Sequence, residues 1–216
     1  MAIYVYTDQP NNRYQPTEYT IAYYPLNSTT ELTDQSWHGY DASMEWTPTY
    51  DNLWITLASP LTWFITWMTE MSWVTQQGTL NIWTKITSFW AHQFVNMWNS
   101  SVDHGSILIC SITNWRIQLG DQWSVSGWYF SSQLNTRYNL IATYTPWSMK
   151  LYVNGNTTPA ITWNVTLSGS ANWKSSIWWF GSWSFILSEA ILESKEWTPQ
   201  EVSNYFNQTK GDYWIQ

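Results

Sequence analysis

The sequence is poor in charged residues, and this shortage argues against two classes of partner. Only 11% of the 216 residues are charged, and the 8 basic residues are spread along the chain against 15 acidic ones. The formal net charge is −7. Because binding to phosphate groups depends on clustered Lys and Arg, we expect neither a nucleic acid nor an anionic membrane surface as a partner.

Cysteine and long apolar runs are also scarce. Cys110 is the single cysteine, so neither an internal disulfide nor a multi-cysteine metal site is expected. It ends the apolar run I-L-I-C, which predicts a small buried side chain. No window approaches the roughly 18 consecutive apolar residues of a membrane-spanning helix, so no membrane insertion is expected. The first residues contain no basic segment followed by an apolar one, so no signal peptide is predicted.

What the sequence does contain is a series of short runs rich in β-branched and aromatic residues, separated by Asn, Gly, Pro and Ser. This pattern favours a two-sheet sandwich over any fold with alternating helices and strands. We expect one domain over residues 1–216, with an N-terminal strand or arm over residues 1–18. The candidate strands are residues 3–7, 19–25, 54–57, 62–67, 79–86, 93–98, 106–112, 116–119, 128–131, 138–144, 149–153, 161–167, 177–180 and 185–192.

Two local signals are specific. Asn154-Gly155 follows an alternating run and supplies the positive φ of a tight turn, which predicts a hairpin strand over residues 149–153. The run over residues 138–144 leads into Thr145-Pro146, so we expect it to be the other strand of the hairpin, joined by a turn of four or five residues. Near the C-terminus, Thr198 and Glu201 have the spacing of a capping box, with Pro199 between them at the first helical position. An apolar stripe follows, so one short helix is predicted over residues 198–208, packed on a sheet.

Three segments, in order along the chain, resemble the concanavalin A-like superfamily, and within it the laminin G-like and pentraxin-like domains. They match the family's opening strand and acidic turn, its hairpin, and its closing strand with a short helix. Together with the strand pattern, this resemblance predicts an all-β, two-sheet antiparallel jelly-roll sandwich with one short C-terminal helix. The segments are residues 24–27 with 33–42, residues 138–144 with 149–155, and residues 187–192 with 195–202.

The sequence departs from the family pattern because Trp stands at several positions where the family prefers Gly. The chain has 20 Trp and 9 Gly, whereas ordinary proteins contain about 7% Gly. Trp37, Trp115, Trp147 and Trp214 are the examples. One hypothesis is that some of these codons are UGA, read as glycine in the source. The other is a protein that is truly rich in Trp and stacks sugars. The codons of the gene decide between them, since UGG throughout excludes the first hypothesis.

Motifs of catalysis are absent. Glycanases with a related jelly roll carry E-x-D-x-E on one strand, and no Glu here has an Asp two residues after it. Glu189, Glu193 and Glu196 come nearest, and we expect them to be structural or solvated. There is no G-x-S-x-G nucleophile turn, no H-E-x-x-H zinc motif and no glycine-rich phosphate loop. We therefore expect no enzymatic activity.

The candidate ligand sites are aromatic and acidic. Trp98 with Asn99, and Trp128 with Tyr129, are candidate sugar platforms, because sugar C–H faces stack on rings while hydroxyls pair with polar groups. Many proteins of the family hold Ca²⁺, and Asp34 and Asp41 lie in the turn that would supply its oxygen ligands. The favoured alternative is that Asp34 caps its own turn through its side chain.

Two function classes follow. The first is a carbohydrate-binding or adhesion module of the laminin G-like type, which acts on a glycan or cell-surface polysaccharide. The second is a structural protein without a glycan ligand, such as a virion, phage-tail or surface-layer component. Self-association at a sheet edge would favour the second class. Either class implies an extracellular location or one at a cell or virion surface.

Overall fold

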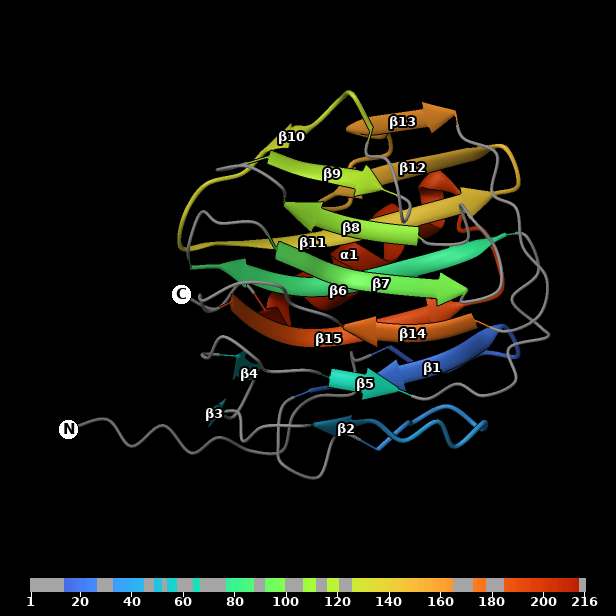
Figure 1. The fold of residues 1–216 in the computed structure, drawn as a ribbon, viewed down its shortest axis with the longest axis vertical. Coiled ribbons are helices and arrows are strands. Elements are labelled where there is room, and N and C mark those ends of the chain that lie inside the picture. Colours follow the sequence, from blue (N-terminus) through green and yellow to red (C-terminus); the bar gives the residue numbers. More distant parts are fainter. Residues whose placement is uncertain are drawn as a thin grey trace.

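The computed structural model describes residues 14–26, 33–44, 49–51, 54–57, 64–66, 77–87, 92–99, 107–111, 116–120, 126–164, 173–177 and 185–213. Two antiparallel sheets lie face to face, and one helix lies on the outer face of the first sheet (Figure 1). This arrangement confirms the predicted all-β sandwich with a C-terminal helix. The extent of the domain stays a prediction, and the strand predicted over residues 3–7 falls outside the described residues.

The first sheet has eight strands and the second has seven. The order in the first sheet is β13 (Ile161–Asn164), β12 (Ser148–Val153), β11 (Thr136–Thr145), β6 (Gly78–Ile86), β15 (Phe185–Glu193), β4 (Trp54–Leu57) and β3 (Thr49–Asp51), while β1 (Thr20–Tyr24) also pairs with β15. The order in the second sheet is β10 (Phe130–Ser131), β9 (Arg116–Gly120), β8 (Ile107–Ser111), β7 (His92–Asn99), β14 (Trp173–Ile177), β5 (Phe64–Thr66) and β2 (Ser43–Met44).

The central strands of the first sheet are buried on both faces, because each face has its own apolar cover. Leu140 and Ala142 of β11 belong to the core between the sheets. Ile141, which lies between them, packs instead in a second cluster with the helix α1 (Pro199–Tyr213). Successive side chains of a strand point to opposite faces, so a strand covered on both sides is apolar throughout. This explains why β11 is buried continuously from Tyr138 to Tyr144.

A β-bulge in β15 sets which of its side chains face the helix. Leu187 pairs with Thr84 and Glu189 with Trp83, so Ser188 is the extra residue. After the bulge, Ile191 belongs to the helix-side cluster, whereas Leu187 before the bulge belongs to the core between the sheets. One inserted residue therefore shifts the alternation of the strand. It places Glu189 on the helix side.

The helix begins as predicted but ends five residues later than residue 208. The capping box forms, because the Glu201 amide donates to Thr198 Oγ1 at 3.2 Å and the Thr198 amide donates to Glu201 Oε2 at 2.7 Å. The C-terminal turns are held by packing, since Thr209 is buried and the Tyr213 ring lies 4.8 Å from the Trp83 ring between centroids. Contacts with the sheet extend the helix through a segment that carries Gly211, a weak helix former.

The predicted hairpin of β11 and β12 is confirmed. Thr145 pairs with Ser148, so the turn has two residues, Pro146 and Trp147, and the expected turn of four or five residues is wrong. Asn154 and Gly155, which follow β12, have positive φ of 52° and 69°. Asn154 Oδ1 accepts a hydrogen bond from the Asn139 amide at 2.9 Å, which ties the second turn to β11. In the part of the chain that the structure describes, no helix is long and apolar enough to cross a membrane.

Candidate functional site

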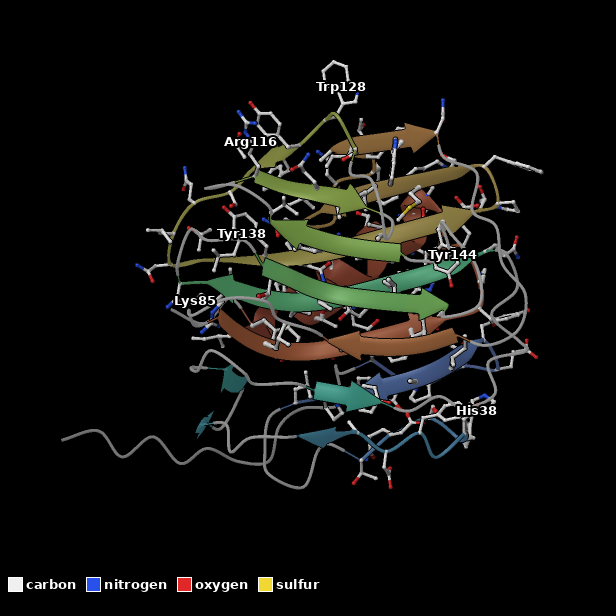
Figure 2. The ribbon with its side chains drawn as sticks, in the orientation of Figure 1. His38, Lys85, Arg116, Trp128, Tyr138 and Tyr144 are labelled. Carbon is white, nitrogen blue, oxygen red and sulfur yellow. The ribbon has the colours of Figure 1, made fainter. Side chains whose placement is uncertain are left out.

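The predicted pair Trp128 and Tyr129 lies on the surface at one end of the sandwich. Trp128 is 75% exposed and Tyr129 is 41% exposed. The guanidinium carbon of Arg116 lies 4.2 Å from the centroid of the Tyr129 ring, which is a cation–π contact. Figure 2 shows Trp128 projecting from the end of the molecule, with Arg116 nearby. We call these three residues the Trp128 surface.

The loop that carries Trp128 is fixed to β9. The Ser126 amide donates to the Leu119 carbonyl at 2.7 Å, and Ser126 Oγ donates to the Trp128 carbonyl at 2.7 Å. Gln118 Nε2 donates to the Ser126 carbonyl at 2.6 Å. A ring that is exposed on an anchored loop loses little conformational entropy when it binds a ligand. The Trp128 surface is therefore preorganised.

Arg116 is the residue that sequence analysis missed. It pairs with Ser131 where β9 meets β10, so the fold brings it beside the 128–129 turn from an earlier part of the chain. Nothing in the local sequence around Arg116 indicates this pairing. Its charge matters chemically, because a guanidinium donates paired hydrogen bonds to a carboxylate.

The second predicted pair, Trp98 and Asn99, lies at the end of β7 in the second sheet. Their side chains fall outside the described residues. Their role as a sugar platform stays a prediction.

The side chain of Asp34 caps its own turn by accepting hydrogen bonds from backbone amides. Asp34 Oδ1 accepts hydrogen bonds from the amides of Tyr23 and Ser36 at 2.9 and 2.8 Å, and Oδ2 accepts from the Tyr40 amide at 3.0 Å. Asp41 Oδ1 in turn accepts from the Asp34 amide at 3.0 Å. A calcium ion at Asp34 would compete with these donors. Among the described residues, no group of three or more His, Cys, Asp or Glu is arranged to hold a metal ion.

The glutamates that come nearest to a catalytic pair are structural. Glu189 and Glu193 are buried on one face of β15, four residues apart, which corresponds to about 13 Å along a strand. A retaining glycosidase needs about 5 Å between its carboxyl groups. Glu189 accepts hydrogen bonds from the hydroxyls of Tyr23, Tyr205 and Tyr213. Burial, and then the charge of this carboxylate, hold the pKa of Tyr205 and of Tyr213 well above the ordinary value.

Glu196, the third of these glutamates, forms an ion pair with Lys150 at 3.0 Å near the surface. Two of the three glutamates are thus buried and hydrogen-bonded, and the third lies in an ion pair.

No family model and no curated protein matches the sequence. Solved structures do match it in fold. The receptor-binding domain of a botulinum neurotoxin C/D mosaic serotype superposes with a TM-score of 0.67 at 16% identity, over 87% of this chain and 51% of that chain. The serotype D ligand-binding domain in complex with N-acetylneuraminic acid gives 0.64 at 16% identity, over 87% and 50%.

A Trypanosoma rangeli sialidase in complex with sialic acid gives a TM-score of 0.70 at 11% identity, over 91% of this chain and 34% of that chain. The chain therefore spans about half the length of the neurotoxin domains and a third of the sialidase. At these identities the likeness concerns architecture. The chain has a β-sandwich fold that is also present in these receptor-binding domains and in this sialidase.

Proposed function

We propose that this chain is a non-catalytic glycan-binding module and that its Trp128 surface contacts the sugar. The observation that carries the proposal is the exposed indole of Trp128 on a loop anchored to β9. Single exposed apolar side chains are normal on a protein surface, but Trp128 is next to a second exposed ring, Tyr129, which the Arg116 guanidinium contacts, so the three form a patch. Stacking of the apolar face of a pyranose on such a ring is a standard way to bind sugars.

Arg116 suggests which sugars suit this surface. Its guanidinium lies over Tyr129 and next to the Trp128 turn, where it is available to pair with a carboxylate. The overall charge is −7, so Arg116 is a local exception on an acidic protein. Two structural neighbours are complexes with sialic acid, an acidic sugar. We infer that the Trp128 surface favours glycans that carry a carboxylate.

The finer assignments belong to the same proposal. The laminin G-like type is supported by the three sequence segments, which form the Asp34 turn, the β11–β12 hairpin and the end of β15 with α1. An adhesion role outside a cell, or at a cell or virion surface, would suit such a module. The structural-protein alternative becomes the better account only if no glycan binds.

The test is a glycan array followed by titration calorimetry, in calcium and again in EDTA. Trp128→Ala is expected to weaken binding about tenfold, the loss of one stacking contact. Trp147→Ala is the matched control, since Trp147 is 69% exposed in the β11–β12 turn. Arg116→Ala is expected to weaken acidic glycans more than neutral ones. Binding is expected to survive EDTA, because the Asp34 carboxylate is occupied by its own turn.

Three results would contradict the proposal or part of it. Equal effects of Trp128→Ala and Trp147→Ala on glycan affinity would show that the Trp128 surface is not the sugar contact. Binding that disappears in EDTA would indicate that the glycan binds through calcium at the Asp34–Asp41 turn. If no glycan binds in either buffer, the structural-protein alternative is favoured, and light scattering should then show self-association.

A further inference from the structure

A cavity of about 620 Å³ lies where the first half of α1 meets β15 and the segment before β1. Its helix wall consists of Glu201, Asn204, Tyr205 and Gln208, which recur at the three- and four-residue spacing of one helix face. The opposite wall comes from residues 14–19, and the chain between β15 and α1 closes one side. We call it the α1 pocket. It shares no residue with the Trp128 surface, and its volume lies in the range of small-molecule sites.

The floor of the α1 pocket is aromatic. The rings of Tyr14, Trp197 and Tyr205 are buried and contact one another. The Trp197 and Tyr205 centroids are 5.2 Å apart, and the Tyr14 centroid is 6.3 Å from Trp197 and 6.2 Å from Tyr205. These rings are held by mutual packing, so they offer a preformed apolar surface rather than one that must be ordered by a ligand.

A buried carboxylate lies at the edge of this floor. Glu193 is 2% exposed, and its Oε1 accepts hydrogen bonds from the hydroxyls of Tyr14 and Thr20. Its Oε2 accepts a bond from Trp197 Nε1. A carboxylate oxygen has two acceptor positions, so Oε2 retains capacity for a ligand donor. The donors that fix Glu193 are neutral, and they leave its charge uncompensated by a bonded cation.

The rim is polar and carries both donors and acceptors. Gln15, Asn204 and Gln208 contribute amides that lie at the exposed edge. Lys195 contributes an ammonium group, but it forms an ion pair with Glu201 and lies 5.6 Å from the centroid of the Tyr19 ring. The mouth of the pocket therefore already contains a cation that is neutralised by the protein.

The charges of the residues that line the α1 pocket bear on which ligands can bind there. Three carboxylates, those of Glu18, Glu193 and Glu201, line the pocket with one ammonium group, that of Lys195. An anionic sugar would meet like charges at short range. A cationic ligand is attracted by these carboxylates but competes at the mouth with Lys195, which already pairs with Glu201 and lies over the Tyr19 ring. An uncharged sugar meets neither obstacle. Its apolar C–H face matches the aromatic floor, and its hydroxyl groups match the amides of the rim.

We propose that the α1 pocket binds one uncharged pyranose unit, at a site separate from the Trp128 surface. The apolar face of the sugar ring contacts the Tyr14, Trp197 and Tyr205 floor. A sugar hydroxyl donates to Glu193 Oε2, and the amides of Asn204 and Gln208 bind hydroxyls at the rim. This site does not depend on Trp128, so it can be tested independently of the proposed function.

The test is binding of uncharged methyl pyranosides and disaccharides at millimolar concentration, measured by saturation-transfer NMR and calorimetry on the full chain. N-Acetylneuraminic acid and choline are the anionic and cationic comparisons. Asn204→Ala removes a rim amide from the pocket. Asn207→Ala is its matched control, because Asn207 is also an exposed asparagine of α1 but does not line the pocket. Each forms exposed side-chain hydrogen bonds to its own helix.

At least one uncharged saccharide is expected to bind. Asn204→Ala is expected to weaken it about fivefold, which corresponds to one lost hydrogen bond, while Asn207→Ala and Trp128→Ala leave it unchanged. The inference is overturned if no uncharged saccharide binds, if the two asparagine variants behave alike, or if choline or N-acetylneuraminic acid is the ligand whose affinity depends on Asn204. If Trp128→Ala abolishes binding of the uncharged saccharide while Asn204→Ala leaves it unchanged, the proposed function is supported and the pocket is overturned.

Discussion

Replacing Glu189 with leucine removes the acceptor that three buried tyrosine hydroxyls share. Glu189 is fully buried, the Tyr213 hydroxyl donates to it at 2.8 Å and the Tyr23 hydroxyl at 3.4 Å. Tyr205 donates to it as well, and itself accepts a bond from Trp83 Nε1 at 3.1 Å. Leucine has a similar volume, so the change leaves the packing nearly intact and acts mainly on the hydrogen bonds.

The expected cost follows from the hydroxyls that lose their acceptor. A buried polar group without a partner costs about 1–3 kcal/mol, and the long Tyr23 bond belongs at the lower end. The leucine side chain offsets part of this loss, because it also removes a buried charge. We expect Glu189→Leu to lower the free energy of unfolding by about 3–5 kcal/mol, a large share of the 5–15 kcal/mol typical of a domain.

Urea denaturation followed by circular dichroism measures this loss, and a double-mutant cycle with Tyr213→Phe tests its cause. Tyr213→Phe alone is expected to cost about 1 kcal/mol. In the Tyr213→Phe background, Glu189→Leu should cost about 1–2 kcal/mol less than in the parent, since one orphaned hydroxyl is gone. If the two effects simply add, or if Glu189→Leu costs under about 1 kcal/mol, the carboxylate does not organise the tyrosines.

Two further predictions concern pH and a turn. Burial raises the pKa of Tyr144, Tyr205 and Tyr213 above the ordinary 10.0, so unfolded chains lose these protons first. The stability that these three groups contribute should be constant below pH 10 and fall above it. Tyrosinate absorbance measured against pH should show a step that coincides with loss of the folded signal, and the absence of such a step would contradict the burial. Gly155 has φ 69°, and an added Cβ would lie 2.5 Å from Phe206 Cβ, so Gly155→Ala is expected to cost at least about 2 kcal/mol in urea. Gly127→Ala, where a Cβ meets nothing within 4 Å, is the control, and equal costs would refute the argument.

Local patterns predicted the elements whose determinants are local. The apolar run over residues 138–144 and the alternating run over residues 149–153 predicted the two strands of the β11–β12 hairpin, and the capping box located the start of α1. The end of α1 was not predictable in this way, because Tyr213 is held by Trp83, which is far away in the sequence. The bulge at Ser188 could not be predicted from the local sequence either, since it depends on the register between β15 and β6.

The candidate site was predicted in part. Exposure of Trp128 and Tyr129 was the condition for a sugar platform, and the structure meets it. Arg116 joins them only through strand pairing. The α1 pocket was missed for a related reason: its walls come from two segments that the fold brings together, and no single segment carries its pattern.

The structure also bears on the excess of tryptophan. Trp83 and Trp197 are buried, and their indole nitrogens donate to Tyr205 and Glu193. Trp37 and Trp147 are 72% and 69% exposed. Within the described residues, positive φ occurs at Leu26, Asn135, Asn154, Gly39 and Gly155, and thus at no tryptophan.

The backbone therefore does not demand glycine at Trp37 or Trp147, although their exposure is compatible with either hypothesis of codon use. Trp115 and Trp214 lie outside the described residues. The α1 pocket uses Trp197, which is buried and donates to Glu193.

The second apolar cluster has a consequence for synthesis on the ribosome. Trp83, Ile141, Tyr152 and Ile191 line the outer face of the first sheet, and their cover comes from residues 197–213. A nascent chain that has emerged as far as β15 can complete both sheets while this face is still bare. Exposed apolar surface on such an intermediate favours aggregation. This risk ends when residues 197–213 leave the exit tunnel and cover the outer face of the sheet. Chains that stop before residue 197 should need a chaperone where the longer chain does not.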